Sequence, residues 1–185
     1  MITEPYKRTN RPDYAAPYCD YFASPIGLIE ILASDEGLLA INSLEEKTQR
    51  VENNMHIVLT IQQLEEYFNR QRTVFNLPLI FDGGTSFQQQ VWKHINEIPF
   101  GKTVSYGSIA LQMGDMKKVR AVAASTGANF FGIVIPCHRV IGADGALTGY
   151  AGGLRANVRC SLLKVFYRHS SNFPFKKPSF LYPNS

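Results

Sequence analysis

The chain has 185 residues, 45% of them hydrophobic and 12% aromatic, enough for one folded domain or two small ones. No apolar run reaches the roughly 18 residues of a membrane span, and the first residues lack the apolar segment of a secretory signal. Three cysteines are too few for a disulfide scaffold, so we expect an intracellular protein, in the nucleus of a eukaryote or the cytoplasm of a bacterium. No Cys or His spacing resembles a zinc site, and we expect neither a metal nor a cofactor.

The distribution of charge along the chain is more informative than the formal net charge of +4. Residues 1–85 hold 7 Lys and Arg against 12 Asp and Glu, whereas residues 86–169 hold 10 against 3. Positive charge gathered in one half indicates a polyanion as the partner of that half. An ordinary solvated surface is the alternative on charge alone.

The first half is predicted to be a small α/β domain over residues 19–82, preceded by a flexible arm over residues 1–18. Two β-like runs, Leu28–Ala33 and Leu38–Ile41, flank a turn, and apolar spacing predicts a helix over residues 57–69. No reaction centre is evident in this half, so we expect it to act as a scaffold.

The second half is predicted to be a mostly helical domain over residues 85–167, followed by a disordered tail over residues 168–185. Its first helix is expected to be capped by Ser86 and to end at Ile98–Gly101. A short helix over Tyr106–Met113 and a second over Met116–Thr126, capped by Asp115, then form a helix-turn-helix candidate.

The second helix of this pair is expected to pack Val119, Val122 and Ala123 inward. Small side chains on its other face would let the helix approach a duplex closely. Lys117 and Lys118 are predicted to contact phosphates rather than bases, with plain surface solubility as the alternative for each. The residues expected on or near the outward face are Lys117, Arg120, Ala121, Ala124 and Ser125.

The strongest chemical signal is Ile135–Val140, in which a thiol stands beside an imidazole and a guanidinium. The apolar run Phe131–Ile135 predicts a buried strand, whose pairing should end at Pro136 because proline has no N–H. Cys137 would then be presented just past the strand, where its thiolate could act as a nucleophile. An inert buried cysteine is the alternative. Neighbouring side chains of an extended segment point to opposite faces, so His138 is not expected to contact the sulfur directly.

Several short stretches of sequence, which together span roughly residues 85–163, resemble the O6-alkylguanine-DNA alkyltransferase family. The resemblance implies a small ribonuclease-H-like α/β domain followed by a winged helix-turn-helix-like alkyltransferase domain. The matching residues are Ser86–Trp92, Ile98–Gly101, Ser105–Tyr106, Val119–Val122, Asn129, Pro136–Ile141 and Tyr150–Leu154.

The resemblance implies a role for most polar residues near the thiol. Cys137 would accept the alkyl group, with His138 as its base acting through a water molecule. Arg139 and Asn129 would hold the active-site turn, and Tyr106 would donate its phenol hydrogen to guanine N3. Two alternatives stay open: Tyr106 as a core residue with a satisfied hydroxyl, and Asn129 as a helix cap.

The resemblance also implies a base pocket and a mode of DNA binding. The backbone around Val140 and Ala151 would recognise the base edge, and Tyr150–Gly153, including Gly152, would form the flexible pocket wall. The target nucleotide must leave the stack to be reached, and Arg120 would fill its place. A phosphate-binding role for Arg120 stays open. The partner would be double-stranded DNA, bound through its minor groove by a monomer.

One departure concerns the glutamate that orients the active-site histidine in this family. The matching stretch here is Leu162–Phe166, and the chain has no Glu after Glu97. An imidazole without a carboxylate partner loses orientation and basicity. Asp144 could replace that glutamate only if the fold brings it near His138.

The predicted function is direct-reversal DNA repair, in which the alkyl group of O6-alkylguanine moves irreversibly to Cys137. O4-alkylthymine is a second candidate substrate. The rival is a non-catalytic protein that binds the lesion and recruits other repair factors. A transcription regulator ranks third, because the helix lacks Asn or Gln to read base edges, and a cysteine hydrolase ranks fourth.

Overall fold

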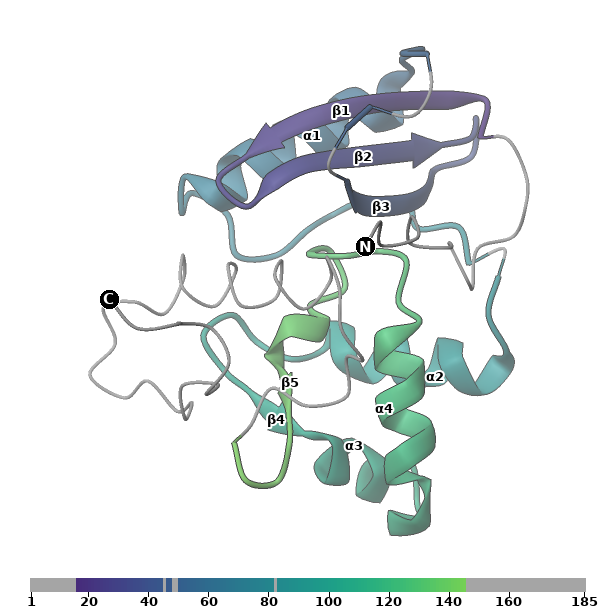
Figure 1. Cartoon of the computed structure of the whole chain (residues 1–185), viewed down its shortest axis with the longest axis vertical. Coiled ribbons are helices and arrows are strands. Elements are labelled where there is room, and N and C mark those ends of the chain that lie inside the picture. Colours follow the sequence, from purple (N-terminus) through teal and green to yellow (C-terminus); the bar gives the residue numbers. More distant parts are fainter. Residues whose placement is uncertain (1–15, 45, 48–49, 82, 146–185) are drawn as a thin grey trace, which may run out of the picture.

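The computed structural model describes residues 16–44, 46–47, 50–81 and 83–145. Within this part of the chain, an antiparallel sheet with one helix lies beside a mainly helical unit (Figure 1). The expected α/β unit followed by a helical unit is therefore confirmed. Most of the predicted arm and all of the predicted tail lie outside the described residues.

The sheet has three strands in the order β1-β2-β3, and each neighbouring pair is antiparallel. β2 and β3 match the two predicted runs, with β3 extended by three residues. β1 was not predicted, because Asp20 interrupts its apolar residues and they show no clear alternation. β1 is stabilised as a strand by its pairing with β2 along its whole length and not by a strand pattern in its own sequence. The strands are β1 (Tyr18–Ser24), β2 (Gly27–Ala33) and β3 (Leu38–Leu44).

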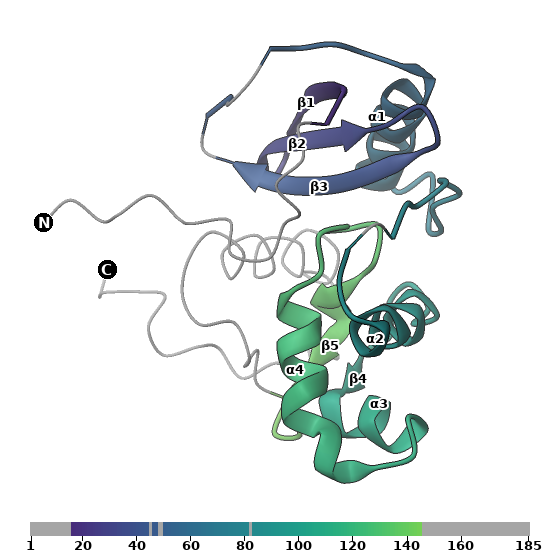
Figure 2. The same cartoon turned by 90° about the vertical axis from the view of Figure 1, so that its right-hand side faces the viewer.

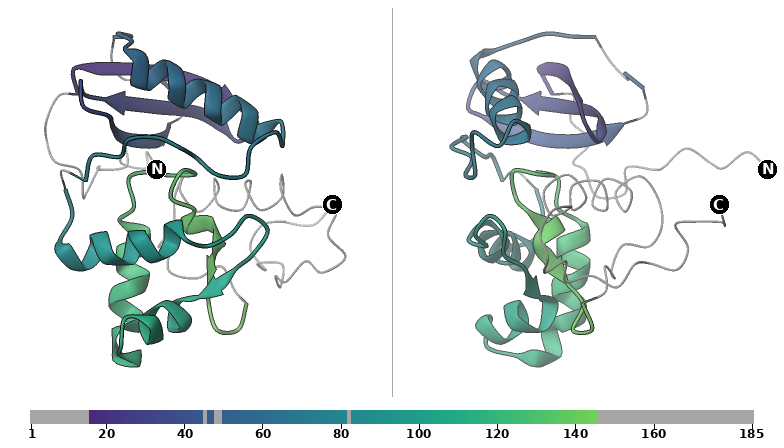
Figure 3. Two further views of the ribbon diagram at one scale, coloured as in Figure 1. Left: turned by 180° about the vertical axis from the view of Figure 1, so that it is seen from behind. Right: turned by 90° about the vertical axis from the view of Figure 1, so that its left-hand side faces the viewer.

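Helix α1 (Met55–Phe68) covers one face of the sheet, as the view from behind shows (Figure 3). Asn54 caps it by accepting a hydrogen bond from the Ile57 N–H. The side chains of Ile57, Leu64 and Tyr67 are fully buried. The predicted helix over residues 57–69 is thus confirmed to within two residues.

The outer edge of β3 is covered by two segments from later in the chain. Leu38 donates its N–H to the Pro78 carbonyl at 2.8 Å and accepts from Ile80 at 2.9 Å. Three residues along, Ile41 donates to the Phe130 carbonyl at 2.8 Å. β3 is also the strand nearest the helical unit (Figure 2). A sheet edge that would otherwise be open to pairing therefore joins the two units.

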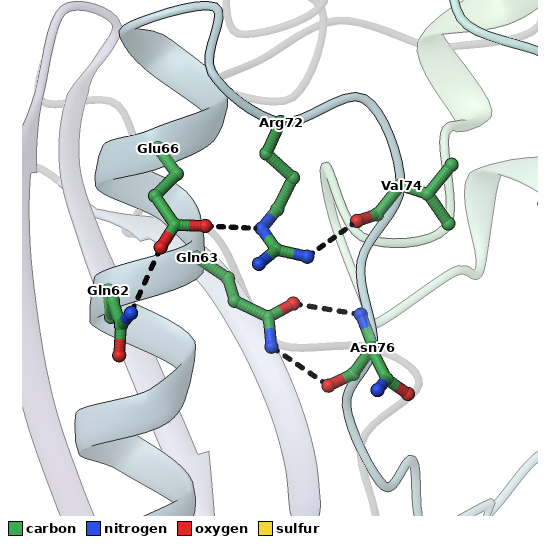
Figure 4. Close-up of polar contacts among 6 residues, drawn as sticks. All are labelled: Gln62, Gln63, Glu66, Arg72, Val74 and Asn76. Carbon is green, nitrogen blue, oxygen red and sulfur yellow. Dashed lines mark hydrogen bonds and ion pairs between the residues drawn. The ribbon is translucent and has the colours of Figure 1, made fainter.

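Polar side chains hold the loop that follows α1 (Figure 4). The Gln63 amide donates to the Asn76 carbonyl and accepts from the Asn76 N–H, both at 2.8 Å. Arg72 pairs with Glu66 at 2.6 Å and donates to the Val74 carbonyl at 2.9 Å. The loop is thereby fixed before it reaches the edge of β3.

The helical unit opens with α2 (Ser86–Asn96), whose N-cap is Thr85 and not Ser86 as predicted. The Thr85 hydroxyl accepts from the Gln88 N–H at 3.2 Å, while the Gln88 side chain accepts from the Thr85 N–H at 2.7 Å. This reciprocal capping box satisfies two backbone donors.

A helix-turn-helix follows, as predicted, although its second helix begins as a 3-10 turn. Asp115 caps that turn by accepting from the Lys117 N–H at 2.8 Å. Trp92 of α2 is fully buried and donates its indole N–H to the Ser125 carbonyl at 2.7 Å, which ties α2 to the second helix. The elements are α3 (Tyr106–Gln112), η1 (Met116–Lys118) and α4 (Val119–Gly127).

Candidate active site

Cys137 begins a 3-10 turn, η2 (Cys137–Arg139), which leads into the short strand β5 (Val140–Ile141). The run Phe131–Ile135 that precedes it is buried, as predicted, but it is not a strand. Only Phe131 bridges to a strand, and Ile133 takes the left-handed conformation with φ of 73°. The apolar run is buried because the chain folds into a tight turn inside the protein, a burial that periodicity cannot distinguish from a strand.

Backbone hydrogen bonds define the geometry of the thiol turn. The Cys137 N–H donates to the Ile135 carbonyl and the Arg139 N–H to the Pro136 carbonyl, both at 2.8 Å. Pro136 makes no ladder pair, as expected, and pairing resumes only at Val140. Cys137 therefore starts a turn instead of ending a strand, and its side chain is partly exposed.

Asn129 holds the buried segment before the thiol turn with both ends of its amide. Its Nδ2 donates to the Ile135 carbonyl and its Oδ1 accepts from the Phe131 N–H, both at 2.9 Å. The end of α4 is capped instead by the Ala128 backbone. Asn129 thus lies where a residue that holds the turn must lie, and the helix-cap alternative does not apply.

Arg139 anchors the other end of the turn and is only 5% exposed. Its Nη1 donates to the Ile98 carbonyl at 2.6 Å. Its guanidinium carbon lies 5.4 Å from the centroid of the Phe100 ring, within the range of a cation–π contact. Both contacts fall on the loop that ends α2, so the motif Ile98–Gly101 supports the thiol turn.

His138 is 1% exposed, whereas its neighbour Cys137 is partly exposed. The imidazole therefore lies in the interior, whereas Cys137 as a residue is partly exposed. The expectation that the two side chains point to opposite faces assumed an extended segment, and the structure has a 3-10 turn there instead. Asp144, considered above as a partner for His138, lies in an exposed turn after β5.

Tyr106 directly follows a short strand that pairs with the strand after the thiol turn. Val104 of β4 (Val104–Ser105) pairs with Val140 of β5 in parallel. Tyr106 follows directly as the first residue of α3 and is 5% exposed. The pairing brings together the strand after the thiol turn and the start of the helix-turn-helix, two segments separated by more than thirty residues in sequence.

The outward face of α4 is small and basic, as predicted, with one correction. Arg120, Ala121 and Ala124 are exposed, as is Lys117 in the preceding turn. Ser125 is only 3% exposed, so it does not belong to this face, and its hydroxyl donates back to the Ala121 carbonyl at 2.7 Å.

Lys118 is less exposed than Lys117. Its ammonium group donates to the Met113 carbonyl at 3.0 Å. It therefore supports the turn of the helix-turn-helix as well as contributing charge.

Several predicted features cannot be placed. Tyr150, Ala151 and Gly152 of the expected pocket wall lie outside the described residues, as does Leu162–Phe166, where the family's glutamate is expected. Three groups help to hold the site and the helices around it, although this role was not predicted from the sequence: Ile41, Phe100 and the indole N–H of Trp92. Each acts through a long-range contact that leaves no mark in the local sequence, although Phe100 does stand in a recognised block.

The described residues contain no cluster of three or more His, Cys, Asp or Glu that could hold a metal ion. Within the same residues, no helix combines the length and apolar character needed to cross a membrane.

Two family models match the chain. Residues 86–163 match the DNA-binding domain of 6-O-methylguanine DNA methyltransferase, and residues 17–81 match its ribonuclease-like domain. A methylated-DNA–protein-cysteine methyltransferase of Methanosarcina acetivorans is 41% identical over 154 residues, which cover 80% of this chain and 97% of the relative. A protein of the same name from Haemophilus influenzae is 39% identical over 150 residues, covering 76% of this chain and 82% of the relative.

Solved structures agree with these matches. The structure of the O6-methylguanine methyltransferase of Mycobacterium tuberculosis has a TM-score of 0.70 and 37% identity, covering 80% of this chain and 91% of the other. OGT of the same organism in complex with DNA has a TM-score of 0.70 and 36% identity, covering 85% and 98%. Both domains, their order and nearly the full length of the relatives are thus matched, and the chain belongs to the 6-O-methylguanine DNA methyltransferase family.

Proposed function

We propose that this protein repairs DNA by moving the alkyl group of O6-alkylguanine, and of O4-alkylthymine, irreversibly to the sulfur of Cys137. Direct-reversal repair by a methylated-DNA–[protein]-cysteine S-methyltransferase is the activity of its family, and curated relatives at about 40% identity carry that name. The observation that supports Cys137 as the acceptor is that it is partly exposed at the start of a turn whose other two residues, His138 and Arg139, are buried. The other described cysteine, Cys19, is 2% exposed and lies in β1.

The transfer is a displacement at carbon. The Cys137 thiolate attacks the alkyl carbon, a sulfur–carbon bond forms, and the bond from that carbon to guanine O6 breaks. The electron pair of the broken bond stays with guanine, and Tyr106 would stabilise the developing negative charge by donating a hydrogen bond from its phenol to N3. His138 would take the thiol proton through a water molecule, and the released guanine anion would take up one proton from solvent, so that charge is balanced. The thioether is not reversed by reductants that act on disulfides, so each protein molecule would react once.

We further propose that α4 enters the minor groove of double-stranded DNA. The relative solved with DNA and the matched DNA-binding domain support DNA as the partner. Exposed Ala121 and Ala124 permit close approach, and Lys117, Lys118 and Arg120 supply positive charge beside them. Arg120 would occupy the space left by the flipped nucleotide. One copy of the chain carries all of these residues, which is why we propose a monomer.

The acceptor assignment is tested with free O6-benzylguanine. Intact mass and a peptide map should show one benzyl group per chain, located on Cys137, with product never exceeding protein. Cys137→Ala should take up nothing, while the matched control Cys19→Ala should react like the parent. Turnover beyond one equivalent would indicate hydrolysis, and a parent without adduct would indicate the lesion-binding rival.

Arg120 is tested by comparing two substrates. Arg120→Ala should slow repair of duplex DNA by about tenfold or more, because the flipped state loses the side chain that replaces the base. Its reaction with free O6-benzylguanine should stay within about twofold of the parent, since no base is flipped; this range is our order-of-magnitude expectation. Lys117→Ala, which removes only a phosphate contact, should weaken duplex binding mainly at low salt. Equal losses of Arg120→Ala on both substrates would remove Arg120 from the flipping role.

A further inference from the structure

The thiol turn is connected to the amino-terminal domain through a short series of side-chain contacts. Arg139, the last residue of the turn, donates to the Ile98 carbonyl and lies over the Phe100 ring. On its other side, Phe100 contacts Tyr67 of α1. The two ring centroids lie 6.0 Å apart and the ring planes meet edge to face at 87°. Phe100 therefore stands between the helix of the sheet domain and the arginine next to the reacting residues.

Tyr67 is itself firmly held. It is fully buried, and its ring also packs against Phe75 at 5.0 Å and Phe68 at 5.8 Å. A fixed aromatic ring on one side limits where the Phe100 ring can lie. The position of Phe100 in turn limits where the buried guanidinium of Arg139 can lie.

A second, independent contact joins the same two regions. Ile41 of β3 donates to the Phe130 carbonyl at 2.8 Å, just before the segment that Asn129 holds. The polypeptide on both sides of Cys137 is thus attached to the amino-terminal domain, by a backbone hydrogen bond before the thiol and by the ring series after it. Neither attachment is needed for the local geometry of a 3-10 turn.

We infer that Phe100 is a positioning residue for alkyl transfer and that Tyr67 acts through it, so that the amino-terminal domain helps to orient the thiol. The sulfur must approach the alkyl carbon along one line, and a displacement of about 1 Å can reduce a rate on the order of a hundredfold. In this role Phe100 would act without contacting the substrate or the sulfur. It limits the position of Arg139, and Arg139 limits the position of the turn that carries Cys137. The inference rests on the proposed function.

The test uses the full chain and free O6-benzylguanine, whose concentration dependence separates the maximal rate of transfer from half-saturation. Phe100→Leu keeps apolar bulk but removes the ring face. It should lower the maximal rate by about fivefold to tenfold, with half-saturation within about twofold, because the geometry of attack changes and binding does not. Phe100→Tyr, which keeps the ring, should restore the rate.

The role of Tyr67 is tested with a matched control on the same ring cluster. Tyr67→Leu should slow transfer by about threefold, whereas Phe75→Leu, which keeps the Tyr67 ring and removes only one of the rings packed against it, should slow transfer by less than that. The double variant Phe100→Leu/Tyr67→Leu should be no slower than Phe100→Leu alone. Folded fractions are measured by thermal unfolding and the rates compared at about 10 °C, and Phe100→Met replaces Phe100→Leu if the latter is unfolded there.

The inference is overturned if a folded Phe100→Leu or Phe100→Met reacts at the parental rate, or if half-saturation accounts for the whole loss. It is also overturned if Phe75→Leu slows transfer as much as Tyr67→Leu does, since the loss would then follow stability. A parent chain that takes up no benzyl group would overturn the proposed function itself. If the parent chain reacts and a folded Phe100→Leu or Phe100→Met variant reacts equally fast, only the positioning role of Phe100 is overturned.

Discussion

Two irregular segments of this protein are held by the same pair of side-chain types, one in each half. In the loop after α1, the Gln63 amide binds both backbone groups of Asn76, and Arg72 donates to a carbonyl at Val74. In the thiol region, the Asn129 amide binds one backbone N–H and one carbonyl, and Arg139 donates to the Ile98 carbonyl.

The surroundings of the two segments differ. Arg72 is 27% exposed and faces a carboxylate, Glu66. Arg139 is 5% exposed and faces an aromatic ring. Water can reach the backbone of Asn76 and the side chain of Arg72 in the first segment, but it cannot reach Asn129 or Arg139 in the second. The same kinds of contact therefore hold an exposed loop in one place and the buried surroundings of the Cys137 turn in the other.

The largest contrast is expected between Asn129→Leu and Gln63→Leu. Phe131 and Ile135 are fully buried, so Asn129→Leu should lower the free energy of unfolding by about 2–5 kcal/mol. Asn76 is exposed, so water can reach its backbone groups, and Gln63→Leu should lower the free energy of unfolding by about 1–2 kcal/mol. Benzyl transfer, measured where both variants are folded, should fall at least about tenfold in Asn129→Leu only. Equal rates in the two variants would break the comparison.

A smaller contrast is expected between the arginines. Arg139→Met keeps length but loses the hydrogen bond and the charge, and should slow transfer by about tenfold, a barrier increase of about 1.4 kcal/mol. Arg72→Met removes a partly exposed ion pair, which contributes about 0–1 kcal/mol to stability, and the transfer rate should not change. Chemical denaturation and single-turnover kinetics on both variants measure the two effects. A slow Arg72→Met would show that the loop also influences the thiol.

The smallest effect concerns Glu66 and pH. Hydrogen bonds from Arg72, and then from Gln62, lower the pKa of Glu66 below its ordinary value of 4.5. The carboxylate therefore stabilises the fold above that value, and the contribution is lost as the pH falls through the lowered pKa. The stability difference between the parent and Glu66→Gln should be present near neutral pH and shrink below the ordinary value of 4.5. A difference that stays constant with pH would contradict this assignment, and Gln62→Ala should reduce the pH dependence only partly.

The local sequence was sufficient to predict those elements whose structure depends on residues close to one another in the chain. The helix α1 was predicted from apolar spacing alone, and the helix-turn-helix from its turn and from Asp115 as a cap. β1 was missed because only its partner strand stabilises it. The Phe131–Ile135 segment was taken for a strand because burial alone does not distinguish a strand from a turn.

By itself, the sequence determined the family and the candidate residues: the thiol, the imidazole, the tyrosine and the basic face of α4 stand in a recognisable order of motifs. Only the tertiary structure decided how they are held. Asn129 acts on residues up to six positions away, Arg139 on a carbonyl 41 residues earlier, and Ile41 on the carbonyl of Phe130 in the other domain. The first two contacts form only when the second domain has folded, and the third only when both domains have, because each needs a partner that the neighbouring sequence does not specify.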